Sequence, residues 1–211
     1  MTAMLAGDTT AFGPALLGLR TELVRSDGAV APLHVDRWRG AAAGEDHWLL
    51  GRCEGPTIDL GCGPGRLLQA LAARGVSGLG VDTAPEAIRQ CRDRGVDAVL
   101  ADVFAPLPGE GSWSHVLLAD GNLGIGGDPV ALLDRAARLL APSGSVLVEL
   151  DAVEPGLWCG QARVRSARSV GRPFPWAAAG TAALPRLAAA AGLRERRVYR
   201  GRRRFAELVA C

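Results

Sequence analysis

Short apolar runs alternate with longer stretches of mixed polar and apolar residues through the middle of the chain. The short runs have the composition of buried strands, whereas the longer stretches repeat apolar residues at helical spacing. The pattern predicts strands over residues 57–60, 78–81, 96–100, 114–119 and 145–150. It predicts intervening helices over residues 66–74, 84–94 and 129–140. Strands and helices that alternate in this way indicate an α/β fold with right-handed crossovers.

Three of these helix ends carry recognisable signals. Gly75 is placed to end the first helix, since glycine adopts the left-handed conformation that often follows a helix. Thr83 is a candidate N-cap of the second helix, with Pro85 at its first turn. Asp128 is a candidate N-cap of the third helix. The boundaries of the helical stretches are therefore consistent with the apolar pattern.

The segments on either side follow other patterns. A leader over residues 1–54 has a mixed helical pattern broken at Gly28 and Pro32, and we expect it to act as a lid. The third segment, residues 152–211, is rich in Arg, Pro and Ala. It contains a predicted helix from about residue 181 to residue 191. It ends in two strand-like runs, 194–199 and 203–209, which indicate a hairpin. We therefore expect a single domain, 1–211, with a cofactor-binding core at 55–151 and a substrate segment and hairpin at 152–211.

Composition and charge narrow the class of protein. The 211 residues are 48% apolar and 22% charged, which is typical of one globular domain. The net charge is only +2, so no overall field selects a nucleic acid or a membrane. Every basic residue is Arg, and the absence of Lys excludes a Schiff-base lysine and a P-loop.

Cysteine use and the N-terminus bear on the compartment. The five cysteines form no C-x-x-C pair, and an odd number suits a reducing cytoplasm. No basic segment followed by an apolar one marks a signal peptide, and no apolar run approaches the roughly 20 residues that cross a bilayer. We expect a cytoplasmic protein with no membrane contact and no metal site, as a monomer or a homodimer.

The most informative motif is a glycine-rich loop, Asp59-Leu60-Gly61-Cys62-Gly63-Pro64-Gly65, which follows a predicted strand and opens a helix. Glycines let the backbone approach a ligand closely, and the helix N-terminus presents free amides. The glycines follow G-x-G-x-G rather than the dinucleotide pattern G-x-G-x-x-G, and Arg66 comes next. Asp59 would repel a pyrophosphate but attract an ammonium or sulfonium ligand.

This loop resembles motif I of the class I S-adenosylmethionine-dependent methyltransferases. The resemblance covers residues 55–151 well and 181–210 loosely, and it implies a Rossmann-like, doubly wound, mostly parallel sheet with an antiparallel C-terminal hairpin strand. It also implies that Asp82 holds both ribose hydroxyls and that Asp102 accepts from the adenine amino group, with Val103 against the ring. The full set of implied cofactor-binding residues is Asp59, Gly61, Cys62, Gly63, Gly65, Asp82, Thr83, Asp102, Val103 and Ala119.

A second run, from Ala119 to Pro129, is similar to one in small actinobacterial-type methyltransferases of unknown substrate. Within it, Asp120 and Asn122 occupy the position beside the methyl group and are the candidate catalytic residues. Asp120 has an equally good alternative reading, in which it orients the amino group of the cofactor or caps a turn. Methyl transfer from a sulfonium is an in-line displacement that depends on positioning, so a strong catalytic motif is not required.

The remaining candidates concern the acceptor. His34, Arg37 and Trp38 in the leader are lid candidates. Glu149 and Asp151 end the fifth strand, where a substrate or solvent would lie. The arginines from Arg163 to Arg172 are expected to help enclose the acceptor. Residues 194–204 carry seven Arg and one Glu, which favours a solvated hairpin face over an RNA-binding surface. His115 is expected to be structural, and His47 is expected to lie on the surface or in the core rather than to act in catalysis.

The sequence therefore predicts transfer of a methyl group from S-adenosylmethionine to a small-molecule acceptor. One alternative is a methyltransferase that acts on RNA or on another acidic substrate. A second is a non-catalytic module that binds the cofactor, and a less favoured one is an NAD(P)-dependent oxidoreductase, against which Asp59 and Asp102 argue.

Overall fold

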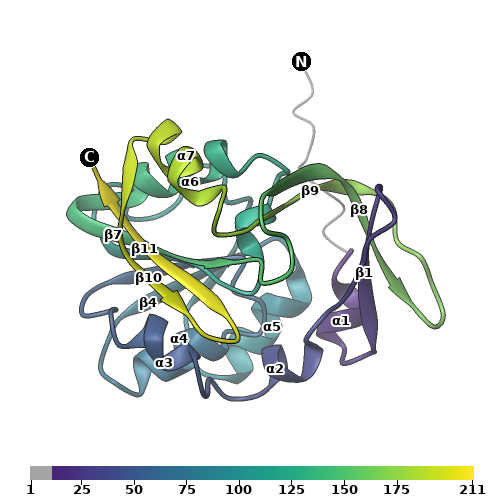
Figure 1. Cartoon of the computed structure of the whole chain (residues 1–211). Helices are drawn as coiled ribbons and strands as arrows, with labels where there is room; N and C mark the ends of the chain where they lie inside the picture. Colours follow the sequence, from purple (N-terminus) through teal and green to yellow (C-terminus); the bar gives the residue numbers. More distant parts are fainter. Residues whose placement is uncertain (1–10) are drawn as a thin grey trace.

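The structure, a computed structural model, describes residues 11–211 and contains two β-sheets (Figure 1). The larger sheet has the order β10-β11-β7-β6-β3-β4-β5. Its strands are β3 (Thr57–Leu60), β4 (Gly78–Asp82), β5 (Ala98–Leu100), β6 (Trp113–Leu118), β7 (Leu140–Leu150), β10 (Leu193–Arg200) and β11 (Arg204–Ala210). Strands β3 to β7 pair in parallel, whereas β11 pairs antiparallel with β7 and with β10. The predicted fold class, a mostly parallel Rossmann-like sheet with an antiparallel C-terminal hairpin, is confirmed.

Helices cover both faces of the larger sheet (Figure 1). One face carries α6 (Pro129–Leu139) and α7 (Leu184–Ala190), and the other carries α3 (Asp46–Leu50), α4 (Arg66–Ala72) and α5 (Pro85–Asp93). Asp128 caps α6 as predicted, because its carboxylate accepts hydrogen bonds from the backbone N–H of Val130 and Ala131. The N-cap of α5 is Ala84 rather than Thr83, and Pro85 opens the helix as predicted.

The smaller sheet is a feature that the sequence did not predict. It has the antiparallel order β2-β1-β8-β9, and its strands are β1 (Thr21–Arg25), β2 (Val30–Pro32), β8 (Leu157–Ser166) and β9 (Phe174–Ala179). The expectation of a mixed helical leader is therefore wrong over β1 and β2. These strands form because β1 pairs with β8, which lies more than a hundred residues further along the chain. Two short helices, α1 (Gly13–Leu16) and α2 (Val35–Arg39), flank these two strands.

The last part of the leader belongs to the core of the larger sheet. Leu49 and Leu50 of α3 are buried against this sheet, and the Trp48 ring stacks on Phe205 of β11 with centroids 5.7 Å apart. The Glu45 carboxylate also accepts hydrogen bonds from the backbone N–H of Arg202 and Arg203 in the β10–β11 turn. The end of the leader is thus fastened to the C-terminal hairpin.

Within residues 11–211, we find no helix with the length and apolar character that a membrane crossing requires.

Candidate functional site

The glycine loop joins β3 to α4 at the carboxyl edge of the larger sheet. Gly61, Gly63 and Gly65 all have positive φ, at 75°, 51° and 78°. A Cβ atom added at Gly61 would lie 2.7 Å from Asn122 Nδ2, and one at Gly65 would lie 2.8 Å from Cys91 Sγ. A Cβ atom at Gly63 would meet nothing within 4 Å. Gly61 and Gly65 therefore serve close packing, whereas Gly63 borders open space that a ligand can approach.

Asp82 at the end of β4 holds this loop in place. Its Oδ2 accepts a hydrogen bond from Gly63 N at 2.9 Å, and its Oδ1 accepts one from Ala84 N at 2.8 Å. Burial raises the pKa of this carboxyl group, and the two N–H donors oppose that shift. Each carboxylate oxygen keeps a second lone pair, so Asp82 can accept further hydrogen bonds from a ligand that lies against Gly63.

Asp59 lies within β3, one strand away, and is 3% exposed. Burial raises the pKa of its carboxyl group to about 7, although the Arg66 guanidinium opposes the shift. No hydrogen bond joins its carboxylate to another residue in the 11–211 range. A cationic ligand nearby would favour its ionised form, as the sequence analysis expected for an ammonium or sulfonium group.

The other predicted cofactor residues lie along the same edge. Asp102, just after β5, accepts a hydrogen bond from Phe104 N at 3.0 Å, and Val103 is buried. Thr83 follows β4, and Ala119 follows β6 and is buried. Cys62 is buried with its Sγ 3.8 Å from Cys91 Sγ, and both thiols are free. The structure thus brings these residues together, while their contacts with the cofactor stay a prediction.

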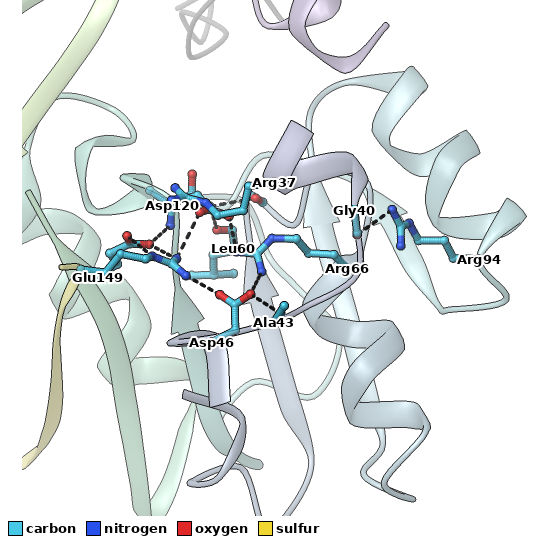
Figure 2. Close-up of polar contacts among 12 residues, drawn as sticks. Arg37, Gly40, Ala43, Asp46, Leu60, Arg66, Arg94, Asp120 and Glu149 are labelled. Carbon is cyan, nitrogen blue, oxygen red and sulfur yellow. Dashed lines mark hydrogen bonds and ion pairs between the residues drawn. The ribbon is translucent and has the colours of Figure 1, made fainter. Parts of the chain in front are cut away.

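A largely buried cluster of charged side chains lies at the end of β6, and Figure 2 shows Arg37, Asp46, Arg66, Asp120 and Glu149 of this cluster. Its centre is Asp120, which has a positive φ of 55° and ion pairs to Arg37 at 2.8 Å and to Arg66 at 2.7 Å. A third guanidinium, that of Arg203, lies 3.2 Å from Asp120. The members of this cluster, called here the β6 ion cluster, are Arg37, Asp46, Arg66, Asp120, Glu149 and Arg203.

The β6 ion cluster holds three Arg and three acidic residues, so its formal charges cancel. Glu149 accepts from Arg203 Nε and Nη2 at 2.7 and 2.6 Å and from Asp120 N at 2.6 Å. Asp46 pairs with both Arg66 and Arg203. Burial opposes the ionisation of Asp46, but the two guanidinium groups outweigh burial and lower the pKa of its carboxyl group. The cluster links the leader, the glycine-loop helix and the C-terminal hairpin.

The sequence analysis missed three members of this cluster. Arg66 had only been noted as the residue after the glycine loop, and Asp46 had not been considered. Arg203 had been assigned to a solvated hairpin face, but its side chain is only 13% exposed. The side chains of Arg196 and Arg197 are 54% and 60% exposed, so the prediction was right for those two residues. The available signal was the position of Arg203 two residues before the apolar Phe205, which places both side chains on one face of an extended chain.

Asn122, the second catalytic candidate, lies in the short 3-10 helix η1 (Asn122–Gly124). Its Nδ2 donates to the backbone oxygens of Leu60 and Gly61, at 2.9 and 2.8 Å. These bonds tie the loop after β6 to the glycine loop. Asn122 therefore has a structural role, which is to hold the glycine loop. Its catalytic role stays a prediction.

The lid candidates lie on or next to α2. Arg37 reaches Asp120, and the Trp38 ring lies 6.3 Å from that of Phe12. Phe12 in turn lies 5.6 Å from Trp176 of β9, which forms a β-bridge with Ile125 beside η1. Aromatic side chains from the leader and from the smaller sheet therefore approach the loop after β6.

Two expectations for the acceptor side need correction or restatement. Arg163 and Arg165 alternate along β8 with the buried residues Ala162 and Val164, so they lie on the opposite, outward face of the smaller sheet. Their predicted contribution to the enclosure is wrong for that reason. Asp151 accepts hydrogen bonds from Val153 N and Glu154 N and so caps a turn, while its contact with a substrate stays a prediction.

The structural histidines are placed as expected. His115 Nδ1 lies 3.0 Å from Ser145 Oγ, and its Nε2 accepts from Glu54 N at 3.3 Å. Both contacts are at the amino edge of the larger sheet, away from the glycine loop. His47 is exposed on α3.

Sequence comparisons agree with this geometry. Residues 58–144 match the family model described as "Methyltransferase domain". A trans-aconitate 2-methyltransferase from Paracidovorax citrulli (strain AAC00-1) is 32% identical over 125 residues, which cover 56% of this chain and 45% of that protein. A ubiquinone biosynthesis O-methyltransferase from Xylella fastidiosa (strain 9a5c) is 31% identical over 102 residues, which cover 43% and 39%. The chain thus spans less than half the length of these curated relatives.

Structural comparison extends the likeness to nearly the whole chain. A methyltransferase from Bacteroides fragilis, crystallised with S-adenosylhomocysteine, superposes with a TM-score of 0.77 at 18% identity and covers 96% of this chain and 94% of its own. The CcbJ methyltransferase from Streptomyces caelestis gives a TM-score of 0.62 at 21% identity, over 83% and 90%. Residues 58–144 thus match a methyltransferase domain, and the chain shares its fold with a methyltransferase crystallised with S-adenosylhomocysteine.

Proposed function

We propose that this protein transfers a methyl group from S-adenosylmethionine to a small-molecule acceptor by in-line displacement. The observation that carries the proposal is the open space at Gly63, bordered by the Asp82 carboxylate that already holds the Gly63 N–H. A ligand that approaches Gly63 meets an acceptor of hydrogen bonds at the end of β4, where this type of fold binds nucleotides.

The residues of the carboxyl edge fit the parts of this cofactor. Asp82 would accept hydrogen bonds from the ribose hydroxyls and Asp102 from the adenine amino group, with Val103 against the ring. Asp59 and the β6 ion cluster would face the charged amino-acid end. When bound, the cofactor supplies an electrophilic methyl group on a sulfonium, and the protein positions the acceptor against it.

The catalytic role first considered for Asp120 is less favoured than its alternative reading. Three guanidinium groups surround this carboxylate, so its oxygens are engaged in ion pairs rather than free to contact an acceptor. We propose that Asp120 orients Arg37 and the amino-acid end of the cofactor, while Asn122 holds the glycine loop. Asp151 would then stabilise the turn that leads from β7 into the smaller sheet rather than contact the acceptor.

Several observations support a small acceptor. The loop after β6 is approached by Phe12, Trp38 and Trp176, so the surface beside it is apolar and aromatic rather than broad and basic. Of the hairpin arginines that might have bound RNA, Arg203 lies within the β6 ion cluster, and Arg196 and Arg197 each lie beside Glu207. The curated relatives are named for trans-aconitate and for ubiquinone biosynthesis, both of which involve small molecules.

We further propose that the protein acts in the cytoplasm, as a monomer or a homodimer. Its five cysteines are free, which suits a reducing compartment. We also propose that it belongs with the small actinobacterial-type methyltransferases, which its run from Ala119 to Pro129 resembles.

Binding calorimetry tests the cofactor assignment. S-adenosylhomocysteine should bind, and NAD should not. The Asp82→Ala variant should lose about 1–3 kcal/mol of binding free energy, because two polar ligand groups lose their partner. Asp97→Ala is a matched control, since Asp97 is exposed before β5 at the opposite edge. Equal affinity of the two variants for S-adenosylhomocysteine would remove Asp82 from the site.

Transfer itself is tested with methyl-labelled S-adenosylmethionine and a panel of small acids, phenols and amines, with total RNA as a separate arm. Label in a small molecule supports the proposal, whereas label in RNA alone replaces it with the nucleic-acid alternative. Binding of S-adenosylhomocysteine without any transfer would favour the non-catalytic module.

A further inference from the structure

The three guanidinium groups of the β6 ion cluster are not used equally. Arg203 donates from Nε, Nη1 and Nη2 to carboxylates of the cluster, and its side chain is 13% exposed. Arg66 donates from both Nη atoms, to Asp46 and to Asp120, and its side chain is 3% exposed. These two arginines are therefore committed to the cluster itself.

Arg37 is differently placed (Figure 2). Its one ion pair with another residue of the 11–211 range joins Nη2 to Asp120 Oδ1 at 2.8 Å, and Arg203 Nη2 shares that oxygen at 3.2 Å. Arg37 Nε is buried without a hydrogen-bond partner in the same range, and so is Nε1 of the next residue, Trp38. A buried N–H group without a partner is unfavourable. Because the Arg37 side chain is also 29% exposed, a ligand can reach its unused donors.

The guanidinium of Arg37 lies where an acceptor would meet the cofactor. Its partner Asp120 begins the loop after β6. Asn122 of this loop donates hydrogen bonds to the backbone oxygens of Leu60 and Gly61. The loop after β6 is thus in direct contact with the glycine loop, and Arg37 reaches this junction from α2.

Three partly exposed aromatic rings lie on the same side of the junction. The Trp38 ring lies 6.3 Å from that of Phe12, which lies 5.6 Å from Trp176 of β9. A Cβ atom added at Gly124 would lie 2.7 Å from Trp176 Cε2, so this indole lies against η1 in the loop after β6. The surface next to Arg37 is therefore apolar and aromatic.

We infer that Arg37 binds a carboxylate group of the acceptor, which is therefore a small acid with a flat apolar body. The inference rests on the proposed methyl transfer and names the class of its substrate. A carboxylate can accept two parallel hydrogen bonds from one guanidinium, and such charge-assisted pairs are strong and directional. Asp120 is then a positioning residue, because its ion pair fixes the orientation of Arg37.

Charge balance also favours an anionic acceptor. The formal charges of the β6 ion cluster cancel, so a carboxylate at Arg37 alone would leave this end of the site negative. S-adenosylmethionine carries one net positive charge, because its sulfonium adds to a zwitterionic amino-acid end. The cofactor and an acid acceptor together leave the site neutral, and their opposite charges attract.

Ligand-observed NMR tests the inference on the protein saturated with sinefungin, which has the net charge of the cofactor but no transferable methyl group. The probes are trans-cinnamate and 4-hydroxybenzoate, each compared with its primary amide, which has the same shape without the charge. At least one acid should bind at least about tenfold more tightly than its amide. Arg37→Gln should abolish this preference. Arg39→Gln is the matched control and should keep it, because Arg39 is an exposed arginine of the same helix.

The outcomes separate cleanly. A preference for the acid that is lost in Arg37→Gln and kept in Arg39→Gln supports the inference. Equal binding of acids and amides overturns it, as does a preference that survives Arg37→Gln. The absence of binding by either acid also overturns it.

The cofactor carries a carboxylate of its own, so a calorimetric arm distinguishes the two sources. S-adenosylhomocysteine is compared with 5′-methylthioadenosine, which lacks the amino-acid end. Arg37→Gln should change the two affinities to the same extent. A loss for S-adenosylhomocysteine alone would assign Arg37 to the cofactor and overturn the inference. If the wild-type protein binds neither nucleoside, the proposed function itself fails.

Kinetics with an identified acid acceptor provide the last test. Arg37→Gln should raise KM by at least about tenfold. It should leave kcat nearly unchanged, since Arg37 binds the acid equally in the ground state and the transition state. Arg37→Lys should recover part of the loss, because it keeps the charge but not the planar fork. An unchanged KM in Arg37→Gln, or a loss confined to kcat, overturns the inference.

Discussion

The two sheets of this protein are built from the chain in opposite ways. In the larger sheet, β3, α4 and β4 follow one another within residues 57–82, so strands that pair are close in sequence. In the smaller sheet, Glu22 of β1 meets Arg165 of β8 across 143 positions. The first sheet carries the proposed cofactor site, and the second is the proposed cover of the acceptor. The cofactor half is thus specified locally, while the acceptor half depends on distant segments that meet only in the folded protein.

Electrostatics separate the two regions as well. The ion pair between Arg66 and Asp46 beside the larger sheet has side chains 3% and 2% exposed. The pair between Arg165 and Glu22 on the smaller sheet has side chains 45% and 47% exposed. Buried pairs are costly to break, whereas exposed pairs contribute little. The difference predicts unequal responses to substitutions of the same kind.

The largest effect should come from deletion of residues 1–40. The deletion removes β1, β2 and α2 but keeps α3 and every strand of the larger sheet. Methyl transfer should be abolished, because Arg37 and half of the smaller sheet are lost. Hydrogen exchange should still show protection in β3 to β7. Full activity of the truncated protein would refute the view that the smaller sheet encloses the acceptor.

A smaller effect should follow the loss of one acid from each region. Asp46→Ala should lower the free energy of unfolding by about 3–5 kcal/mol, since it leaves Arg66 and Arg203 buried with uncompensated charge. Glu22→Ala should cost about 0–1 kcal/mol. Urea denaturation of both variants measures the difference. Similar losses would show that burial does not distinguish the two regions.

The third effect depends on pH. The pKa of Asp59 is raised by burial to about 7 in the folded protein, against 3.8 for the free side chain. The folded state therefore holds a proton that the unfolded state releases, and this contribution to stability is lost as the pH rises through 7. Relative to wild type, Asp59→Asn should gain up to about 1.4 kcal/mol per pH unit between pH 5 and pH 7, with no further gain above. Urea denaturation at four pH values provides the test, and a pH-independent difference would contradict it.

The smallest effect compares two glycines. Gly63 and Gly75 both have positive φ, at 51° and 73°, and a Cβ atom would meet nothing within 4 Å at either position. Alanine should therefore strain both backbones to a similar degree. Only Gly63→Ala should weaken the binding of S-adenosylhomocysteine, by about tenfold or 1.4 kcal/mol. Equal affinities of the two variants in calorimetry would mean that the glycine loop is merely a turn.

Much of the larger sheet was predictable because its signals are local. The strand over residues 57–60 has the predicted bounds, and Asp128 caps the helix that it was expected to cap. The smaller sheet was not predictable, because β1 and β2 alone are short strands with few buried residues. Their stability as strands comes from β8, whose alternation of buried and exposed residues becomes informative only once its partner is known.

The sequence by itself determined the resemblance to methyltransferases, the alternation of strands and helices in the parallel part of the larger sheet, and the positions of Gly63, Asp82 and Asp102 at one edge of that sheet. These follow from local periodicity and from the rule that parallel strands end together. Only the tertiary structure decided that Asp120 is surrounded by Arg37, Arg66 and Arg203. Ion pairing depends on distance and burial rather than on spacing along the chain, so a run of arginines such as 202–204 does not reveal which of them is buried.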